Sequence, residues 1–212
     1  MKVDFFFSFR SSYSYLAVHR LKSLSSRLEG VEFEWYPVFP PPGGPEPQIT
    51  ADPRRLAYAR PDFARFLEAY GLPPAAPPHS TDTDWMPSHA GFLWAREQGR
   101  MQEYADAIFR CRWALSLDPG DDAVLRDVAV EVGLDPDGLL AAAHDEKYHE
   151  QVSLGMIHFV RSGFFGVPAF TVGEEKFWGN DRFEWAIREI LRQQGRPVPD
   201  LRDDPFGAVV KL

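Results

Sequence analysis

Apolar and polar positions follow two different rhythms over the first 37 residues. Residues 3–9 are nearly continuously apolar and rich in Phe, which predicts a short buried strand. Apolar residues then recur at helical spacing over residues 13–28, and Gly30 follows as a stop. In residues 31–37 apolar and acidic positions alternate, so we expect a second strand with one buried face. The order strand, helix, strand predicts a βαβ unit whose two strands run parallel.

The middle of the chain has helical patterns. Residues 37–50 are rich in Pro and Gly, which indicates a connection or a loop beside a site. From about residue 52 to residue 161 apolar residues recur at helical spacing. The expected helices cover residues 56–70, 88–98, 101–115, 124–132, 136–143 and 147–162.

Strand patterns return near the end of the chain. The short apolar run 169–172 predicts one strand, and another follows the acidic turn at 174–175. Residues 183–191 carry a closing helical pattern. Asn180 or Asp181 is the expected cap of that helix.

The order of these elements is the order found in thioredoxin, with a long helical block between its two halves. We therefore predict an α/β, thioredoxin-like fold with a large all-helical insertion. Residues 1–45 and 163–212 are expected to form the discontinuous thioredoxin-like domain. Residues 46–162 are expected to form the helical insertion domain.

Composition narrows the range of partners. Of the 212 residues 44% are hydrophobic, which is enough for a core, and the formal net charge of −8 argues against a general nucleic-acid binder. No apolar run reaches the roughly eighteen residues that a membrane-spanning helix needs. The N-terminus lacks a basic leader followed by an apolar stretch, so we expect a cytoplasmic protein without a signal peptide.

Cysteine and histidine usage limits the chemistry further. Cys111 is the single cysteine, which excludes an internal disulfide, a CxxC pair and a cysteine-rich zinc site. The helical spacing around Cys111 indicates a buried structural thiol. The six histidines form no HxH or HExxH spacing, so we expect no metal site.

Serine residues occupy the junction between the first strand and the first helix. The segment from Ser11 to Ser14 takes the position that the CxxC pair has in thioredoxin folds. A helix N-terminus stabilises a thiolate or another small anion there. Serine cannot exchange disulfides, but its hydroxyl can donate a hydrogen bond to a thiolate that a cofactor brings. The alternative is that Ser11 or Ser12 is only the N-cap of the helix.

Two further segments carry candidate contacts. Val167 and Pro168 lie between a helix and a strand, where thioredoxin folds have a cis proline that faces the helix N-terminus. A trans proline that starts a strand is the alternative. Asn180 and Asp181 open the last helix, where a carboxylate can take the ammonium of a ligand. The alternative at that position is a plain N-cap.

Three stretches together resemble one family. DFFFSFRSSYSYLA, GVPAF and FWGNDR are similar to the opening, the cis-proline loop and the last helix start of the 2-hydroxychromene-2-carboxylate isomerases and kappa-class glutathione transferases. Both belong to the thioredoxin-like group that includes the periplasmic, DsbA-like disulfide oxidoreductases, and the resemblance covers most of the chain. It implies that Ser11 contacts the sulfur of the cofactor glutathione. It also implies that the backbone of Val167 and Pro168 contacts the peptide of glutathione. Asn180 and Asp181 would hold its γ-glutamyl end.

The chain departs from the family in two places. Ser12 stands where the family usually has proline. The middle segment of the family usually offers a lysine and an asparagine to the ligand, whereas here Arg54 or Arg55 replaces the lysine and no asparagine is present. Tyr58 fits the family pattern, and Trp85 is expected as a wall of the substrate pocket. The expected substrate contacts are Ser14, Arg55, Tyr58 and Trp85.

The resemblance implies a glutathione-dependent cis-trans isomerase that acts on a small aromatic intermediate of aromatic catabolism and forms a homodimer. A kappa-like glutathione transferase and a non-catalytic thioredoxin-like binding protein are the alternatives. Glutathione binding separates the two enzymes from the binding protein. Turnover without net conjugation separates the isomerase from the transferase.

Overall fold

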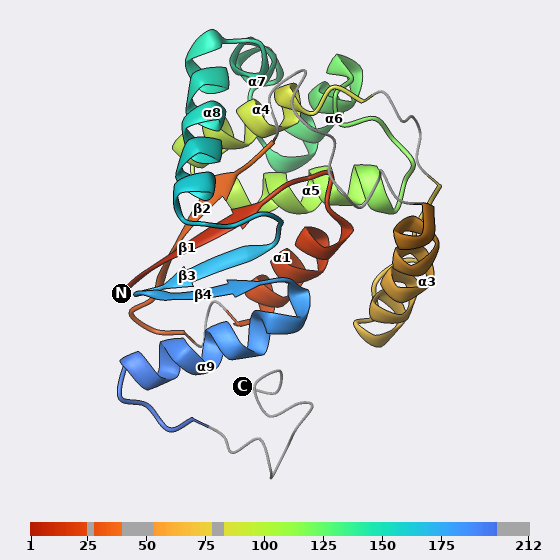
Figure 1. Ribbon diagram of the computed structural model, residues 1–212. Coiled ribbons are helices and arrows are strands. Elements are labelled where there is room, and N and C mark those ends of the chain that lie inside the picture. Colours follow the sequence, from red (N-terminus) through yellow and green to blue (C-terminus); the bar gives the residue numbers. More distant parts are fainter. Residues whose placement is uncertain (25–27, 40–52, 78–82, 199–212) are drawn as a thin grey trace. The chain divides into compact units, whose positions relative to one another are not determined.

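The computed structural model describes residues 1–24, 28–39, 53–77 and 83–198 (Figure 1). The chain divides into two compact units, Met1–Tyr36 with His158–Leu212, and Pro37–Ile157. The predicted domain boundaries, after residues 45 and 162, lie nine and five residues later along the chain than the boundaries after Tyr36 and Ile157. Most of the Pro/Gly-rich connection expected over residues 37–50 lies outside the described residues.

The first unit has a mixed four-stranded sheet in the order β2-β1-β3-β4. Strand β3 pairs antiparallel with both β1 and β4, so β2 and β1 form the parallel pair that the βαβ pattern predicts. The thioredoxin-like fold is therefore confirmed. The elements of this unit are β1 (Lys2–Phe7), α1 (Ser12–Leu24), β2 (Glu32–Pro37), β3 (Ala169–Val172), β4 (Glu175–Trp178), the 3₁₀ turn η2 (Asn180–Arg182) and α9 (Phe183–Gln193).

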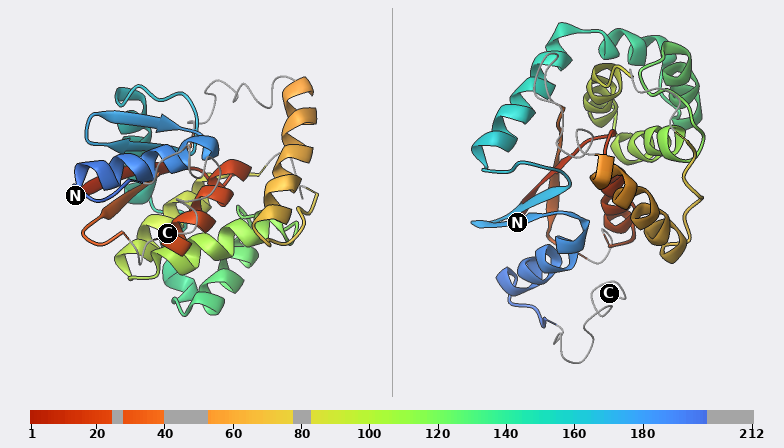
Figure 2. Two further views of the ribbon diagram at one scale, coloured as in Figure 1. Left: turned by 90° about the horizontal axis from the view of Figure 1, so that it is seen from below. Right: turned by 45° about the vertical axis from the view of Figure 1, so that its right-hand side comes forward.

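Strand β1 ends in three phenylalanines, Phe5–Phe7, because side chains cover both faces of this part of the strand. On one face Phe5 stacks on Phe170 of β3, with ring centroids 4.8 Å apart, and Phe170 in turn meets Phe183 of α9. Helices α1 and α9 share this face, since Arg20 of α1 lies over the Phe183 ring (Figures 1 and 2). On the other face Phe6 packs against aromatic side chains from the region that follows Ile157. Burial on both faces explains the continuous apolar run.

The first strand is shorter than predicted. It ends at Phe7 rather than Phe9, because the Ser11 N–H donates to the Ser8 carbonyl at 3.0 Å and closes a turn. Phe9 is nevertheless fully buried. The predicted strand end was wrong because burial alone does not distinguish a strand residue from a buried turn residue.

The second unit is all-helical over its described residues, as predicted. Its helices are α3 (Pro53–Ala69), α4 (Met86–Glu97), α5 (Met101–Trp113), α6 (Asp122–Val132), α7 (Pro136–Ala143) and most of α8 (Glu146–Arg161). Helix α4 packs against α5 and α7, and α6 packs against the same two helices.

Local signals place the ends of these helices. The Asp121 carboxylate accepts the Ala123 N–H at the start of α6, and Gly133 ends the same helix in the left-handed conformation with φ of 72°. The Asp135 carboxylate accepts the Gly138 N–H at the start of α7. Cys111 of α5 is buried, as predicted, and burial raises the pKa of its thiol to about 11.

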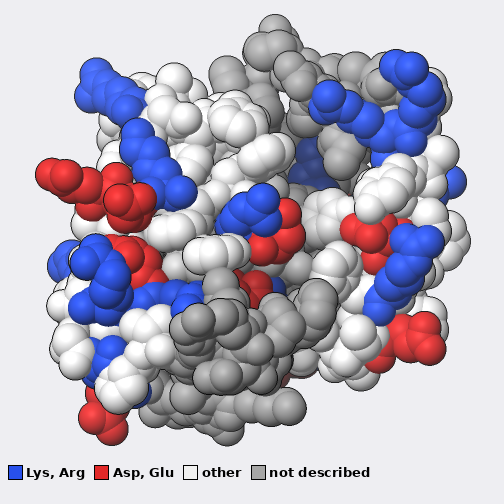
Figure 3. Space-filling model, turned by 60° about the horizontal axis from the view of Figure 1, so that its bottom comes forward, with Lys and Arg blue, Asp and Glu red and all other residues white. Residues whose placement is uncertain are grey.

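The described residues contain neither a membrane-spanning helix nor a cluster of metal ligands. None of the helices in residues 1–24, 53–77 and 83–198 is both long enough and apolar enough to cross a bilayer. The described residues also contain no group of three or more His, Cys, Asp or Glu side chains arranged to hold a metal ion. On the face drawn in Figure 3, acidic and basic side chains are interspersed.

Candidate functional site

Ser11 lies at the N-terminus of α1, directly after the turn that ends β1. Its Oγ accepts the Ser14 N–H at 3.1 Å, and its carbonyl accepts the Tyr15 N–H at 3.2 Å. Ser11 is therefore the N-cap of α1. Capping uses Oγ of Ser11 as an acceptor, and it leaves the hydroxyl proton available for a second bond.

The Ser11 hydroxyl donates its proton toward the cis-proline loop. Its Oγ lies 3.5 Å from the Val167 carbonyl oxygen, which is the long end of the hydrogen-bonding range. A bond this long can be exchanged for a better acceptor at small cost. The Val167–Pro168 peptide bond is cis, as predicted. The structure thus brings Ser11 and Val167 together from positions 156 residues apart.

Ser14 is fully buried, one turn further into the helix. Its Oγ accepts the Ser8 N–H at 3.3 Å and so ties the helix to the preceding loop. A substrate contact through the Ser14 hydroxyl would require this hydrogen bond to break.

A second turn is joined to the cis-proline loop. The Gly179 N–H donates to the Pro168 carbonyl at 2.8 Å. Gly179 has φ of 105°, and a Cβ atom there would collide with the carboxylate of Asp181. The positive φ favours glycine at this turn, which joins β4 to the 3₁₀ turn that carries Asp181.

Neither Asn180 nor Asp181 caps the last helix with its side chain, so that prediction was wrong. Residues 180–182 form a 3₁₀ turn, and α9 begins at Phe183 with Arg182 at its N-cap position and no side-chain cap bond. The Asp181 carboxylate instead lies 2.9 Å from Nη1 of Arg182, and 67% of its side chain is exposed. It is open to a ligand.

Asn180 points inward and is held by an arginine that the sequence analysis missed. Arg20 donates to the Asn180 carbonyl at 2.9 Å and to its Oδ1 at 3.3 Å, and it forms an ion pair with Glu184. Both Arg20 and Asn180 are buried, at 5% and 3% exposed. Nδ2 of Asn180 has no hydrogen-bond partner among the described residues. The available signal was the position of Arg20, four residues after Leu16 and four before Leu24, on the apolar stripe of α1.

Two aromatic side chains are exposed beside Val167. Phe165 is 76% exposed and Trp178 is 47% exposed, and their ring centroids are 4.4 Å apart. A Cβ atom on Gly166 would collide with the Trp178 indole, so the glycine lets the ring lie against the loop. The sequence analysis selected neither residue. The available signal was that Phe165 directly precedes the GVPAF stretch and that Trp178 lies within the FWGNDR stretch.

The other predicted substrate contacts belong to the helical unit. Arg55 and Tyr58 lie on α3 and are exposed, Tyr58 at 65%. Trp85 precedes α4 and is buried, and its carbonyl accepts the Ser88 hydroxyl at 3.1 Å.

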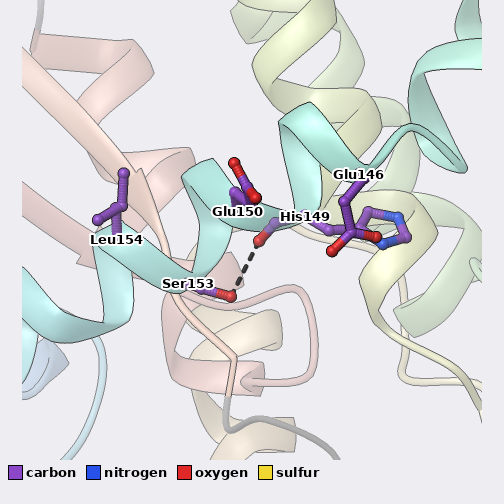
Figure 4. Close-up of a pocket in the computed structure, with 5 residues that line it drawn as sticks. All are labelled: Glu146, His149, Glu150, Ser153 and Leu154. Carbon is purple, nitrogen blue, oxygen red and sulfur yellow. Dashed lines mark hydrogen bonds between the residues drawn. The ribbon is translucent and has the colours of Figure 1, made fainter.

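An open depression of about 290 Å³ runs along the outside of α8 (Figure 4). In this depression the Ser153 hydroxyl donates to the His149 carbonyl, and Nε2 of His149 lies 2.8 Å from the Ala143 carbonyl oxygen. The depression contains none of the predicted site residues. It is lined by Glu146, His149, Glu150, Ser153 and Leu154.

Known proteins resemble this chain over most of its length. A family model described as a DSBA-like thioredoxin domain matches residues 2–190. A 2-hydroxychromene-2-carboxylate isomerase from Sphingobium xenophagum is 29% identical over 196 residues, covering 89% of this chain and 97% of the relative. Glutathione S-transferase kappa 1 from Caenorhabditis elegans is 26% identical over 230 residues, covering 100% of this chain and 98% of the relative. A solved structure of a 2-hydroxychromene-2-carboxylate isomerase superimposes with a TM-score of 0.77 at 25% identity, covering 92% of this chain and 98% of that chain.

Proposed function

The chain belongs to the family of DSBA-like thioredoxin domains, and from this premise we propose that it is a glutathione-dependent isomerase of the 2-hydroxychromene-2-carboxylate type. The observation that carries the proposal is the Ser11 hydroxyl, which stands at the N-terminus of α1 and faces Val167. Relatives named 2-hydroxychromene-2-carboxylate isomerase support it, since three of them are 27–29% identical to this chain.

The reacting thiol has to come from outside the chain. Cys111 is the single cysteine, and it is buried with a raised pKa, so it is a poor nucleophile. A DSBA-like fold without a CxxC pair cannot exchange disulfides by itself. Glutathione would supply a thiolate that adds reversibly to a conjugated carbon of the substrate, which permits rotation about the former double bond.

Ser11 is assigned to the thiolate. Its hydroxyl would exchange the long bond to Val167 for a charge-assisted bond to sulfur, while its Oγ still accepts the Ser14 N–H. The positive end of the α1 dipole favours the same negative charge. Both effects lower the pKa of a bound thiol and raise the thiolate fraction at neutral pH.

The other end of glutathione is assigned to the turn after β4. The exposed Asp181 carboxylate would pair with the α-ammonium group of the γ-glutamyl residue. Asn180, whose buried Nδ2 lacks a partner among the described residues, is assigned to the adjacent carboxylate. The backbone of Val167 and Pro168 would hold the peptide between these two ends. These residues fit glutathione at the sulfur, the peptide and the ammonium group.

The aromatic substrate is assigned to the exposed pair of Phe165 and Trp178. Large exposed aromatic rings next to a candidate site indicate a contact surface, because exposed apolar patches usually bind something. The pair adjoins Val167 and Gly179, so a planar substrate stacked on it would lie near the proposed sulfur position.

Two measurements test the proposal. Calorimetric titration should detect glutathione binding, and its absence would favour a thioredoxin-like binding protein. With glutathione present, 2-hydroxychromene-2-carboxylate should be consumed without consumption of glutathione. Stoichiometric loss of glutathione to a conjugate would instead favour a kappa-like transferase, the activity named for the Caenorhabditis relative.

We also propose that the chain forms a homodimer in the cytoplasm. Light scattering of the purified protein tests the assembly, because a dimer would have twice the chain mass of 24.1 kDa.

A further inference from the structure

Arg20 of α1 is a buried cation that binds two other elements at once. Only 5% of the residue is exposed, and its guanidinium lies 4.1 Å from the centre of the Phe183 ring. Nη1 donates to the Asn180 carbonyl at 2.9 Å and to Oδ1 of Asn180 at 3.3 Å, while Nη2 forms an ion pair with Glu184. One planar guanidinium therefore holds the turn η2 through Asn180 and the first turn of α9 through Glu184.

The Asn180 carbonyl shares a peptide plane with the amide group of Asp181. The peptide bond between these two residues is trans, so its carbonyl oxygen and its N–H point in opposite directions. Since the carbonyl points toward the buried Arg20, the Asp181 N–H points away from it. That N–H has no acceptor among the residues that the structure describes. The contact with Arg20 thus sets the direction of the Asp181 N–H.

Local capping does not fix this turn. Gly179 and Arg182, at the N-cap positions of η2 and α9, make no side-chain cap bond. The Asp181 carboxylate is largely exposed and meets only the side chain of Arg182, which belongs to the same turn, within the described part of the chain. Two backbone groups bond the turn to other described elements, namely the Gly179 N–H to the cis-proline loop and the Asn180 carbonyl to Arg20. Arg20 therefore provides one of the two points that orient the turn.

We propose that Arg20 is a positioning residue that makes the site selective for the γ-glutamyl end of glutathione. Arg20 itself does not contact the ligand. It keeps the Asp181 N–H turned outward, where it can donate to the α-carboxylate of the γ-glutamyl group while the Asp181 carboxylate takes the α-ammonium. A turn that holds this orientation only about a tenth of the time would bind about tenfold more weakly. The inference rests on the proposed function, because it names what selects one end of the same ligand.

N-acetylcysteinylglycine is the matched probe, because it keeps the thiol and both amides of glutathione but lacks the amino-acid end of the γ-glutamyl group. Calorimetry should show that the wild-type chain binds glutathione more tightly than this analogue. Arg20→Lys keeps the charge without the planar fork, so it should weaken glutathione binding about tenfold and leave the affinity for the analogue unchanged. Because Ser11 is untouched, KM for glutathione should rise while kcat at saturating glutathione stays near the wild-type value.

Glu184→Gln is the matched control. It removes the ion pair of Arg20 but neither of its hydrogen bonds to Asn180, so it should lower Tm and retain the preference for glutathione. Should Arg20→Lys fail to fold, Arg20→Met combined with Glu184→Gln removes both charges together and leaves neither without its partner. This paired variant should lose the preference for glutathione as Arg20→Lys does.

A double-mutant cycle with Asp181→Asn locates the effect. If Arg20 acts through the turn, Arg20→Lys combined with Asp181→Asn should weaken glutathione binding by less than the product of the two separate losses. A combined loss equal to that product would show that the two residues act independently, and it would overturn the inference.

The remaining outcomes separate the inference from the proposed function. An unchanged preference for glutathione in Arg20→Lys, or in the paired variant, would overturn the inference and leave the proposed function standing. Equal weakening of both thiols would also overturn it, because a purely structural role of Arg20 has that result. Absence of glutathione binding by the wild-type chain would contradict the proposed function and the inference with it.

Discussion

Removal of the Ser11 hydroxyl tests the proposed chemistry, because this one group caps α1 and also faces Val167. Loss of the cap in Ser11→Ala should cost about 1 kcal/mol of unfolding free energy. In a chain of this size that corresponds to a Tm lower by roughly 2–4 °C. Loss of a hydrogen bond to a thiolate should cost a further 1.5–3 kcal/mol, roughly, in the reaction with glutathione. Turnover should therefore fall about ten- to a hundredfold.

Loss of the Ser11 hydroxyl should also change how turnover depends on pH. A donor to the thiolate lowers the pKa of the bound thiol, so its removal raises that pKa by about one to two units. The rise of activity with pH should shift upward by the same amount. Turnover of 2-hydroxychromene-2-carboxylate at saturating glutathione, measured across pH, gives both quantities in one experiment.

Two variants separate the cap from the donor. Ser11→Gly lacks the hydroxyl but costs a cap position only about a few tenths of a kcal/mol, so it should be as slow as Ser11→Ala and nearly as stable as the wild type. Ser14→Ala removes the buried acceptor of the Ser8 N–H and should cost about 1–3 kcal/mol of stability while leaving turnover near the wild-type rate. Wild-type turnover and an unshifted pH profile in both Ser11 variants would refute the assignment of Ser11 to the thiolate.

Three further substitutions and one labelling experiment probe the rest of the structure. Asp181→Asn should weaken glutathione binding by about 1 kcal/mol, roughly fivefold, because its carboxylate is largely exposed, and calorimetry should find this with an unchanged Tm. Arg20→Met should lower the unfolding free energy by about 3–5 kcal/mol, since it leaves the partly buried Glu184 without its buried partner, and denaturant titration measures this loss. Trp178→Ala should raise KM for the aromatic substrate about fivefold through loss of an aromatic contact, with glutathione affinity unchanged. Cys111, with a thiol pKa raised to about 11, should react with iodoacetamide slowly at neutral pH and faster only as pH approaches that value, whereas rapid labelling of the folded chain at neutral pH would contradict its burial.

Periodic patterns predicted the elements because each pattern has a local physical cause. The second half of strand β1 is continuously apolar since both of its faces are covered. The start and end of α6 follow from a carboxylate cap at Asp121 and a left-handed glycine at Gly133, both visible in the sequence. The expected cap at Asn180 or Asp181 failed because the same residue types can also form a separate 3₁₀ turn. Propensity indicates a turn at that place but does not decide between the two geometries.

The partners of charged residues inside helices were the part of the structure that the sequence predicted least well. Arg20 and Arg112 each lie in a helix whose sequence pattern fixes the apolar stripe, but no local pattern reveals a partner. The partner of Arg20 is 160 residues away at Asn180, and Arg112 has no direct hydrogen-bond partner for its Nε and Nη1 among the described residues. Only a three-dimensional structure shows whether such a cation is paired with a distant residue.

Helix α1 explains why three motifs that are separated in the sequence lie close together. At the N-cap of α1, the Ser11 hydroxyl contacts the Val167 carbonyl of the cis-proline loop. The Pro168 carbonyl of this loop accepts the Gly179 N–H from the turn after β4. Two turns further along α1, Arg20 reaches the same turn through the Asn180 carbonyl. These hydrogen bonds therefore connect α1 to the cis-proline loop, the loop to the 3₁₀ turn, and the 3₁₀ turn back to α1. A ligand that spans Ser11 and Asp181 would therefore meet groups whose spacing is already fixed, which reduces the entropy lost on binding.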